Sequence, residues 1–168
     1  MLLIVDPQID FIDGSLPVPG AVEAMDSLAS HIKEHGLEYK LICITCDRHT
    51  LTHCSFNDFG GKWPIHCVES SVGAAIWPAI MEAILQHADK THILYKGEDS
   101  DKDEYSIFQN PKGTAYLDSL IKNEGIAEID ICGLAGDVCV AATLCDAEKR
   151  YVDINFNLLD KFTAYINR

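Results

Sequence analysis

The chain has 168 residues, of which 48% are hydrophobic, and its formal net charge is -13. This length predicts about one domain, and the apolar fraction is too high for a disordered chain. The acidic balance argues against a nucleic-acid binder, because no basic surface is available for phosphates. No apolar run reaches the roughly 18 residues that a membrane span needs. We therefore expect a single domain over residues 1–168 that binds neither nucleic acid nor membrane.

The predicted elements alternate between short apolar strands and longer helices. The first strand, residues 2–5, is a continuous apolar run, which is typical of a strand buried on both faces. The later elements are, in chain order, a helix introduced by Pro19-Gly20 and ending at His35, strand 39–45, helix 77–88, strand 92–95, helix 113–125, strand 128–134, helix 137–150 and strand 151–156. The remaining tail fits a helix or an edge strand. The alternation predicts an α/β, three-layer, Rossmann-like fold with a mostly parallel sheet and helices on both faces.

Chemically active side chains follow four of these strands. Asp6 ends the first strand, Asp47 and His49 follow the second, Lys96 ends the third, and a glycine-rich segment leads from the fourth to Cys139. In a parallel sheet the carboxyl ends of the strands meet at one edge, where ligands bind. The topology therefore predicts that these residues converge.

Cys139 lies in the first turn of the helix predicted over 137–150. Backbone N–H groups and the helix dipole favour a thiolate there and suit an oxyanion. Taken alone, Cys139 fits a small packing residue equally well. Asp6 alone fits a structural cap, and Lys96 alone fits a surface lysine. Together they supply a nucleophile, a base and an electrostatic partner.

The loop after the second strand is rich in cysteine and histidine: CDRHTLTHCSFNDFGGKWPIHC. A zinc finger is excluded by spacing, because only two residues separate the C-x-x-C pair ending at Cys46 from the pair His49 and His53. Asp47 and His49 with the later His66 fit a metal site with open coordination positions. A polar loop with hydrogen-bonded histidines is the alternative.

The seven cysteines are an odd number in a chain without an export signal. Free thiols in a reducing cytosol are the default interpretation, so we expect a cytoplasmic protein.

Several motifs resemble those of the isochorismatase-like cysteine hydrolases, and within them the nicotinamidases. The matching segments are VDPQIDF (5–11), GSLPVPGA (14–21), DRHTLTHCSF (47–56), KWPIHCV (62–68), KG with YSIF (96–97 and 105–108) and GLAGDVCV (133–140). The resemblance runs from the first residue to about Tyr151. The W-P-x-H-C piece is the most particular to nicotinamidases.

The resemblance implies a role for each catalytic position. Cys139 would be the nucleophile, Asp6 the general base and Lys96 the third catalytic residue. The enzyme would convert nicotinamide, and also pyrazinamide, through a thioester and release ammonia. It would be a homo-oligomer.

The resemblance also implies a metal and a ring pocket. Asp47, His49 and His66 would bind one divalent metal, zinc or otherwise iron or manganese, with His53 as a further ligand. The substrate-binding residues would be Phe11 and Trp63 on either side of the pyridine ring, with Leu134 and Ala135 joined by a cis peptide.

Two departures from the family pattern affect these expectations. The region after Tyr151 lacks the usual family ending, and Arg48 stands where relatives often have an aromatic residue. The alternatives are a hydrolase of the same superfamily that acts on another small amide or a vinyl ether, and a non-catalytic metal-binding or thiol-redox protein.

Overall fold

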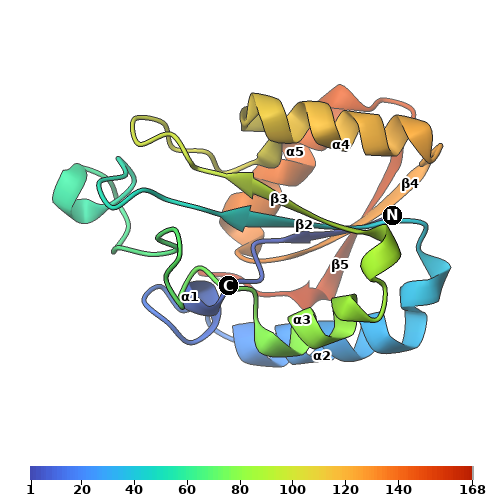
Figure 1. Cartoon of the computed structure of the whole chain (residues 1–168), viewed down its shortest axis with the longest axis horizontal. Coiled ribbons are helices and arrows are strands. Elements are labelled where there is room, and N and C mark those ends of the chain that lie inside the picture. Colours follow the sequence, from blue (N-terminus) through green and yellow to red (C-terminus); the bar gives the residue numbers. More distant parts are fainter. Residues whose placement is uncertain (168) are drawn as a thin grey trace.

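The computed structural model describes residues 1–167 and contains one twisted β-sheet with helices on both faces (Figure 1). The strands are β1 (Leu2–Val5), β2 (Ile42–Asp47), β3 (Thr91–Lys96), β4 (Glu128–Gly133) and β5 (Asn155–Thr163). The helices are α1 (Ile9–Ile12), α2 (Ala21–His35), α3 (Pro78–Leu85), α4 (Pro111–Asn123) and α5 (Ala141–Arg150). All strand pairs are parallel, in the order β3-β2-β1-β4-β5. This arrangement confirms the predicted fold class.

The central strand β1 is buried on both faces, as its apolar sequence predicts. Alternate residues of a strand point to opposite faces, so β1 contributes to two separate cores. Leu2 and Ile4 pack in the core that α2 and α3 cover, whereas Leu3 and Val5 pack in the core beneath α4. Figure 1 shows α2 and α3 on one side of the sheet and α4 and α5 on the other. Burial on both sides places β1 and its carboxyl end at the centre of the molecule.

The C-terminal third differs from the prediction in its element bounds. The fifth strand is β5, residues Asn155–Thr163, and not residues 151–156. Tyr151 ends α5, and a turn follows it before β5 begins. Of the tail that fitted either a helix or an edge strand, residues 157–163 belong to this edge strand, and residues 164–167 follow it without regular structure. Most of β5 is exposed or half-buried, so its apolar pattern is weak and the strand bounds could not be read from it.

The carboxyl ends of the strands carry the irregular segments. The turn from Gly136 to Val140 is π-helical and leads into α5, so Cys139 lies just before that helix. The helix predicted over 77–88 stops at Leu85, and a 3-10 turn follows it.

Within residues 1–167, no helix combines the length and the apolar character that crossing a bilayer requires.

Candidate active site

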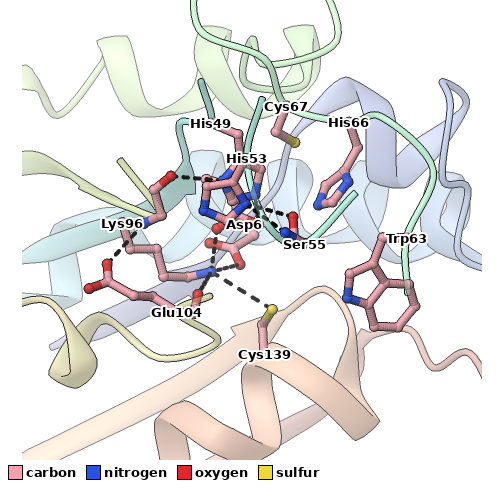
Figure 2. Close-up of polar contacts among 12 residues, drawn as sticks. Asp6, His49, His53, Ser55, Trp63, His66, Cys67, Lys96, Glu104 and Cys139 are labelled. Carbon is pink, nitrogen blue, oxygen red and sulfur yellow. Dashed lines mark hydrogen bonds and ion pairs between the residues drawn. The ribbon is translucent and has the colours of Figure 1, made fainter. Parts of the chain in front are cut away.

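Lys96 is the centre of a buried cluster at the carboxyl edge of the sheet (Figure 2). Its ammonium Nζ lies 2.8 Å from Asp6 Oδ2 and 2.6 Å from Asp47 Oδ1. The same atom lies 3.8 Å from Cys139 Sγ. Atoms of Asp6, Asp47 and Cys139 lie within 4.8 Å of one another. The topology therefore brings together Asp6, Lys96 and Cys139, which come from three different strand ends.

The two carboxylates that share Lys96 have opposite pKa shifts. Burial raises the pKa of Asp6, and the nearby Lys96 opposes this shift only in part. Burial also acts to raise the pKa of Asp47, but Lys96 and His49 outweigh it and hold that pKa below its usual value. The side chain of Thr45 donates a hydrogen bond of 2.7 Å to Asp6 Oδ1. Asp47 is thus the fixed anion of the pair, and Asp6 is the carboxylate that takes up a proton more readily.

The Cys139 thiol is buried, and burial raises its pKa well above the usual value. The Lys96 ammonium lowers this pKa, but the Asp6 and Asp47 carboxylates act in the opposite direction. Burial and the two carboxylates therefore act against the thiolate form that a helix N-terminus favours. Because its pKa is raised, this thiol needs a base to remove its proton before it can act as a nucleophile.

Asp47, His49 and His66 form a set of potential metal ligands. Each offers one donor atom, and these three atoms lie within 4.8 Å of one another. The Nδ1 atoms of His49 and His66 lie 2.8 Å from the backbone carbonyls of Gly97 and Pro64, respectively. These contacts fix the orientation of both rings and leave each Nε2 free to coordinate a metal, as in histidine metal sites. The donor set fits a divalent metal with two imidazoles and one carboxylate.

His53 lies beside this set, but its own ring nitrogens already have protein partners. Its ring stacks on His49 with 4.0 Å between centroids. Nδ1 lies 2.7 Å from Ser55 Oγ, and Nε2 lies 3.1 Å from the carbonyl of Lys102. The structure therefore brings His53 close to the three donors without directing a free nitrogen towards them.

A pocket opens beside Cys139 and the three donors. The residues that line it are Phe11, Leu16, Val18, Asp47, His49, Trp63, His66, Asp103, Glu104, Tyr105, Ala135, Val138, Cys139 and Ile166. Figure 2 shows Trp63 across the pocket from the Lys96 cluster, below His66. The predicted residues Phe11, Trp63 and Ala135 are thus on its wall. Leu134 is buried in the core behind it, and the Leu134–Ala135 peptide is cis.

Gln8 positions the metal-ligand loop and was not singled out from the sequence. Its side chain is buried and exchanges two hydrogen bonds with the backbone of Asp47, at 2.8 Å to the carbonyl and 2.7 Å from the N–H. The only sequence signal for it is its place in the segment VDPQIDF.

Glu104 forms hydrogen bonds with Lys96 and with the glycine that follows it. Its carboxylate accepts hydrogen bonds from the Gly97 N–H at 2.9 Å and from Asn110 at 3.0 Å, and its backbone carbonyl accepts one from Lys96 at 3.2 Å. Gly97 has φ +68°, and a Cβ there would lie 2.4 Å from the His49 ring, so this close approach requires glycine. Arg48 lies outside the pocket, where its guanidinium pairs with Glu98.

The site combines a buried cysteine, aspartate and lysine at the edge of an α/β sheet. Two histidines and a carboxylate that could bind a metal lie beside them. This combination is typical of a cysteine hydrolase with an adjoining metal site. The family model described as "Isochorismatase domain" matches residues 1–154, and the chain belongs to this family. This match confirms the resemblance found in the sequence.

Named relatives agree with this assignment. The nicotinamidase/pyrazinamidase of Mycobacterium tuberculosis is 32% identical over 154 residues, which cover 88% of this chain and 78% of that protein. The pyrazinamidase of Pyrococcus horikoshii, solved with zinc, is 31% identical with a TM-score of 0.83, covering 99% and 86% of the two chains. An L. infantum protein solved with nicotinate is 32% identical with a TM-score of 0.84, covering 99% and 81%.

Proposed function

We propose that this protein is a metal-dependent cysteine amidohydrolase that converts nicotinamide to nicotinate and ammonia. The observation that carries the proposal is the buried contact of Lys96 with Asp6, 2.8 Å away, and with Cys139 Sγ, 3.8 Å away. Cys139 also lines a pocket whose wall includes the potential metal ligands Asp47, His49 and His66. A metal-binding or redox protein does not require this separate cluster. The nicotinamidase relatives support the substrate.

The reaction begins with a proton transfer from Cys139 to Asp6. The raised pKa of Asp6 makes its carboxylate a stronger base, and the thiol lies within its reach. The resulting thiolate attacks the carboxamide carbon and forms a tetrahedral oxyanion. Lys96 remains protonated, because the two carboxylates raise its pKa well above the usual value despite burial, and it stabilises the thiolate. The N–H groups of Ala135 and Cys139 act as the oxyanion hole.

Asp6 then acts as the general acid. It returns its proton to the amide nitrogen as the carbon–nitrogen bond breaks, so ammonia leaves and a thioester on Cys139 remains. A water molecule attacks the thioester while Asp6 takes its proton, and the acid product departs as Asp6 returns that proton to the sulfur. One carboxyl group thus serves both half-reactions.

The metal site completes the proposal. Asp47, His49 and His66 would bind one divalent metal, with zinc as the first choice and iron or manganese as the next. His53 would lie beside the metal as the least direct of the four candidate ligands, because its ring nitrogens contact Ser55 and Lys102. When bound, the metal supplies a Lewis acid that orients the pyridine nitrogen of the substrate. Phe11 and Trp63 flank the ring, with Leu134 and Ala135 behind it.

The substrate is tested by ammonia release. We expect purified protein supplied with a divalent metal to release ammonia from nicotinamide and from pyrazinamide. Benzamide has the same shape without a ring nitrogen, and we expect it to react far more slowly. If neither nitrogen-containing ring amide releases ammonia, the substrate assignment is wrong. A hydrolase of the same family acting on another amide would then be the next candidate.

The ligand role of His66 is tested by metal content and not by activity. We expect His66→Ala to lower metal affinity by at least about tenfold, since loss of even an outer partner costs 10- to 100-fold. Metal is measured by elemental analysis after equilibrium dialysis. His92→Ala is the matched control, because that ring contacts Tyr116 and no donor of the set. Equal metal content in both variants would remove His66 from the site.

Three broader parts of the proposal are independent of the chemistry. The chain acts as one hydrolase domain over residues 1–168, it works in the cytoplasm, and it forms a homo-oligomer. Light scattering of the purified protein measures the oligomeric state.

A further inference from the structure

The C-terminal segment 164–167 packs against the turn that carries the nucleophile. The Gly136 N–H donates a 2.7 Å hydrogen bond to the carbonyl of Ala164. A Cβ on Gly136 would lie 2.3 Å from the Tyr165 ring, so the ring lies directly on the turn. Both contacts fall within three residues of Cys139. The path of the tail is therefore tied to the geometry of the active site.

Asp137 holds the end of this segment. Its Oδ1 accepts a hydrogen bond from the Ile166 N–H at 2.9 Å, and its Oδ2 accepts one from the Asn167 N–H at 3.0 Å. The Asn167 side-chain amide adds a third at 3.1 Å. A carboxylate that accepts several backbone N–H groups is a strong local anchor.

Ile166, whose backbone Asp137 binds, lines the pocket. It is half-buried and lines the same cavity as Phe11, Trp63 and Cys139. Phe11 belongs to α1, so the pocket joins α1 to the segment that follows β5 (Figure 1). Phe11 and Trp63 come from motifs shared with the family, whereas Ile166 comes from the tail that departs from the family pattern.

We infer that Ile166 is a specificity-determining residue that limits the size of the ring amide, and that Asp137 is the positioning residue that holds it there. This inference rests on the proposed amidohydrolase function. An apolar side chain on the wall contacts the ring equally in the ground state and the transition state. Its loss should therefore raise KM more than it lowers kcat.

The experiment compares nicotinamide with its 2-, 4-, 5- and 6-methyl derivatives. We expect Ile166→Ala to raise KM for nicotinamide and to raise the relative kcat/KM of at least one methyl derivative by about tenfold, the value of one methyl-sized change in an apolar pocket. Ile166→Val should shift both quantities in the same direction by less. Leu158→Ala, on the exposed part of β5 and outside the pocket, should retain the wild-type selectivity. Unchanged selectivity in both Ile166 variants, with an active wild type, would overturn the inference.

The anchor is tested by hydrogen exchange as well as by kinetics. Asp137→Asn should speed amide exchange in peptides covering residues 164–167 and shift selectivity in the direction of Ile166→Ala. Asp137→Glu, which keeps both oxygens, should restore part of each effect. Asp153→Asn is the exposed control. Unchanged tail exchange in Asp137→Asn would overturn the anchoring role. If the wild type hydrolyses no ring amide, both the proposed function and the role of Ile166 in selectivity are wrong. The amide hydrogen exchange of residues 164–167 would still test whether Asp137 anchors this segment.

Discussion

Replacing Cys139 with alanine is expected to reduce ammonia release from nicotinamide by at least about 10⁴-fold, a typical result of removing a covalent nucleophile. No other thiol can substitute for it, because among the residues that line the pocket Cys139 is the only cysteine. The variant should keep its fold, since the change removes one buried sulfur atom. Turnover is measured as ammonia release with metal-loaded protein.

Cys145→Ala is the matched control for this prediction. Cys145 is an exposed free thiol on α5, six residues after the nucleophile, and it does not line the pocket. We expect it to retain wild-type turnover. The Cys139→Ala variant should also bind metal as the wild type does, because the three predicted ligands are unchanged. If Cys139→Ala keeps about a tenth of the wild-type rate, the thioester mechanism is wrong.

Replacing Lys96 with methionine is expected to lower the free energy of unfolding by about 3–5 kcal/mol, the usual cost of removing one partner from a buried ion pair. The Lys96 side chain is fully buried between Asp6 and Asp47. Methionine fills a similar volume but removes the ammonium that both buried carboxylates contact. The same variant should lose most of its turnover, because the thiolate loses its electrostatic partner. Urea denaturation with a chelator present measures stability without a metal contribution.

Lys33→Met is the comparison for stability. Its ion pair with Glu82 spans 3.7 Å between two largely exposed side chains, so we expect a loss of only about 0–1 kcal/mol. An unpaired buried carboxylate has a raised pKa in the folded state. The resulting loss of folding free energy is complete above that raised pKa, and it falls to zero as the pH drops below the ordinary aspartate pKa of about 3.9. The deficit of Lys96→Met should therefore shrink as the pH is lowered. Equal losses in the two variants would contradict the central role of Lys96.

Much of the fold and part of the site could be predicted from the sequence. The apolar run Leu2–Val5 has the composition of a doubly buried strand, and its alternation with helical segments implies a parallel sheet. Parallel topology then requires Asp6, Lys96 and Cys139 to lie at one edge, where the structure places them. The bounds of β5 could not be predicted, because an edge strand is half exposed and its apolar pattern is weak.

The sequence by itself determined the fold class, the family and the predicted catalytic, metal and ring-pocket residues, because these follow from local patterns and shared motifs. Only the tertiary structure decided that burial raises the pKa values of Cys139 and Asp6, whereas Lys96 and His49 outweigh burial at Asp47 and lower its pKa. It also decided that Ile166 lines the pocket while its backbone N–H is bound by Asp137. Those properties depend on burial and on contacts between segments more than a hundred residues apart in some cases, as for Asp6 and Cys139. No local pattern encodes such distances, and they arise only when the chain has folded.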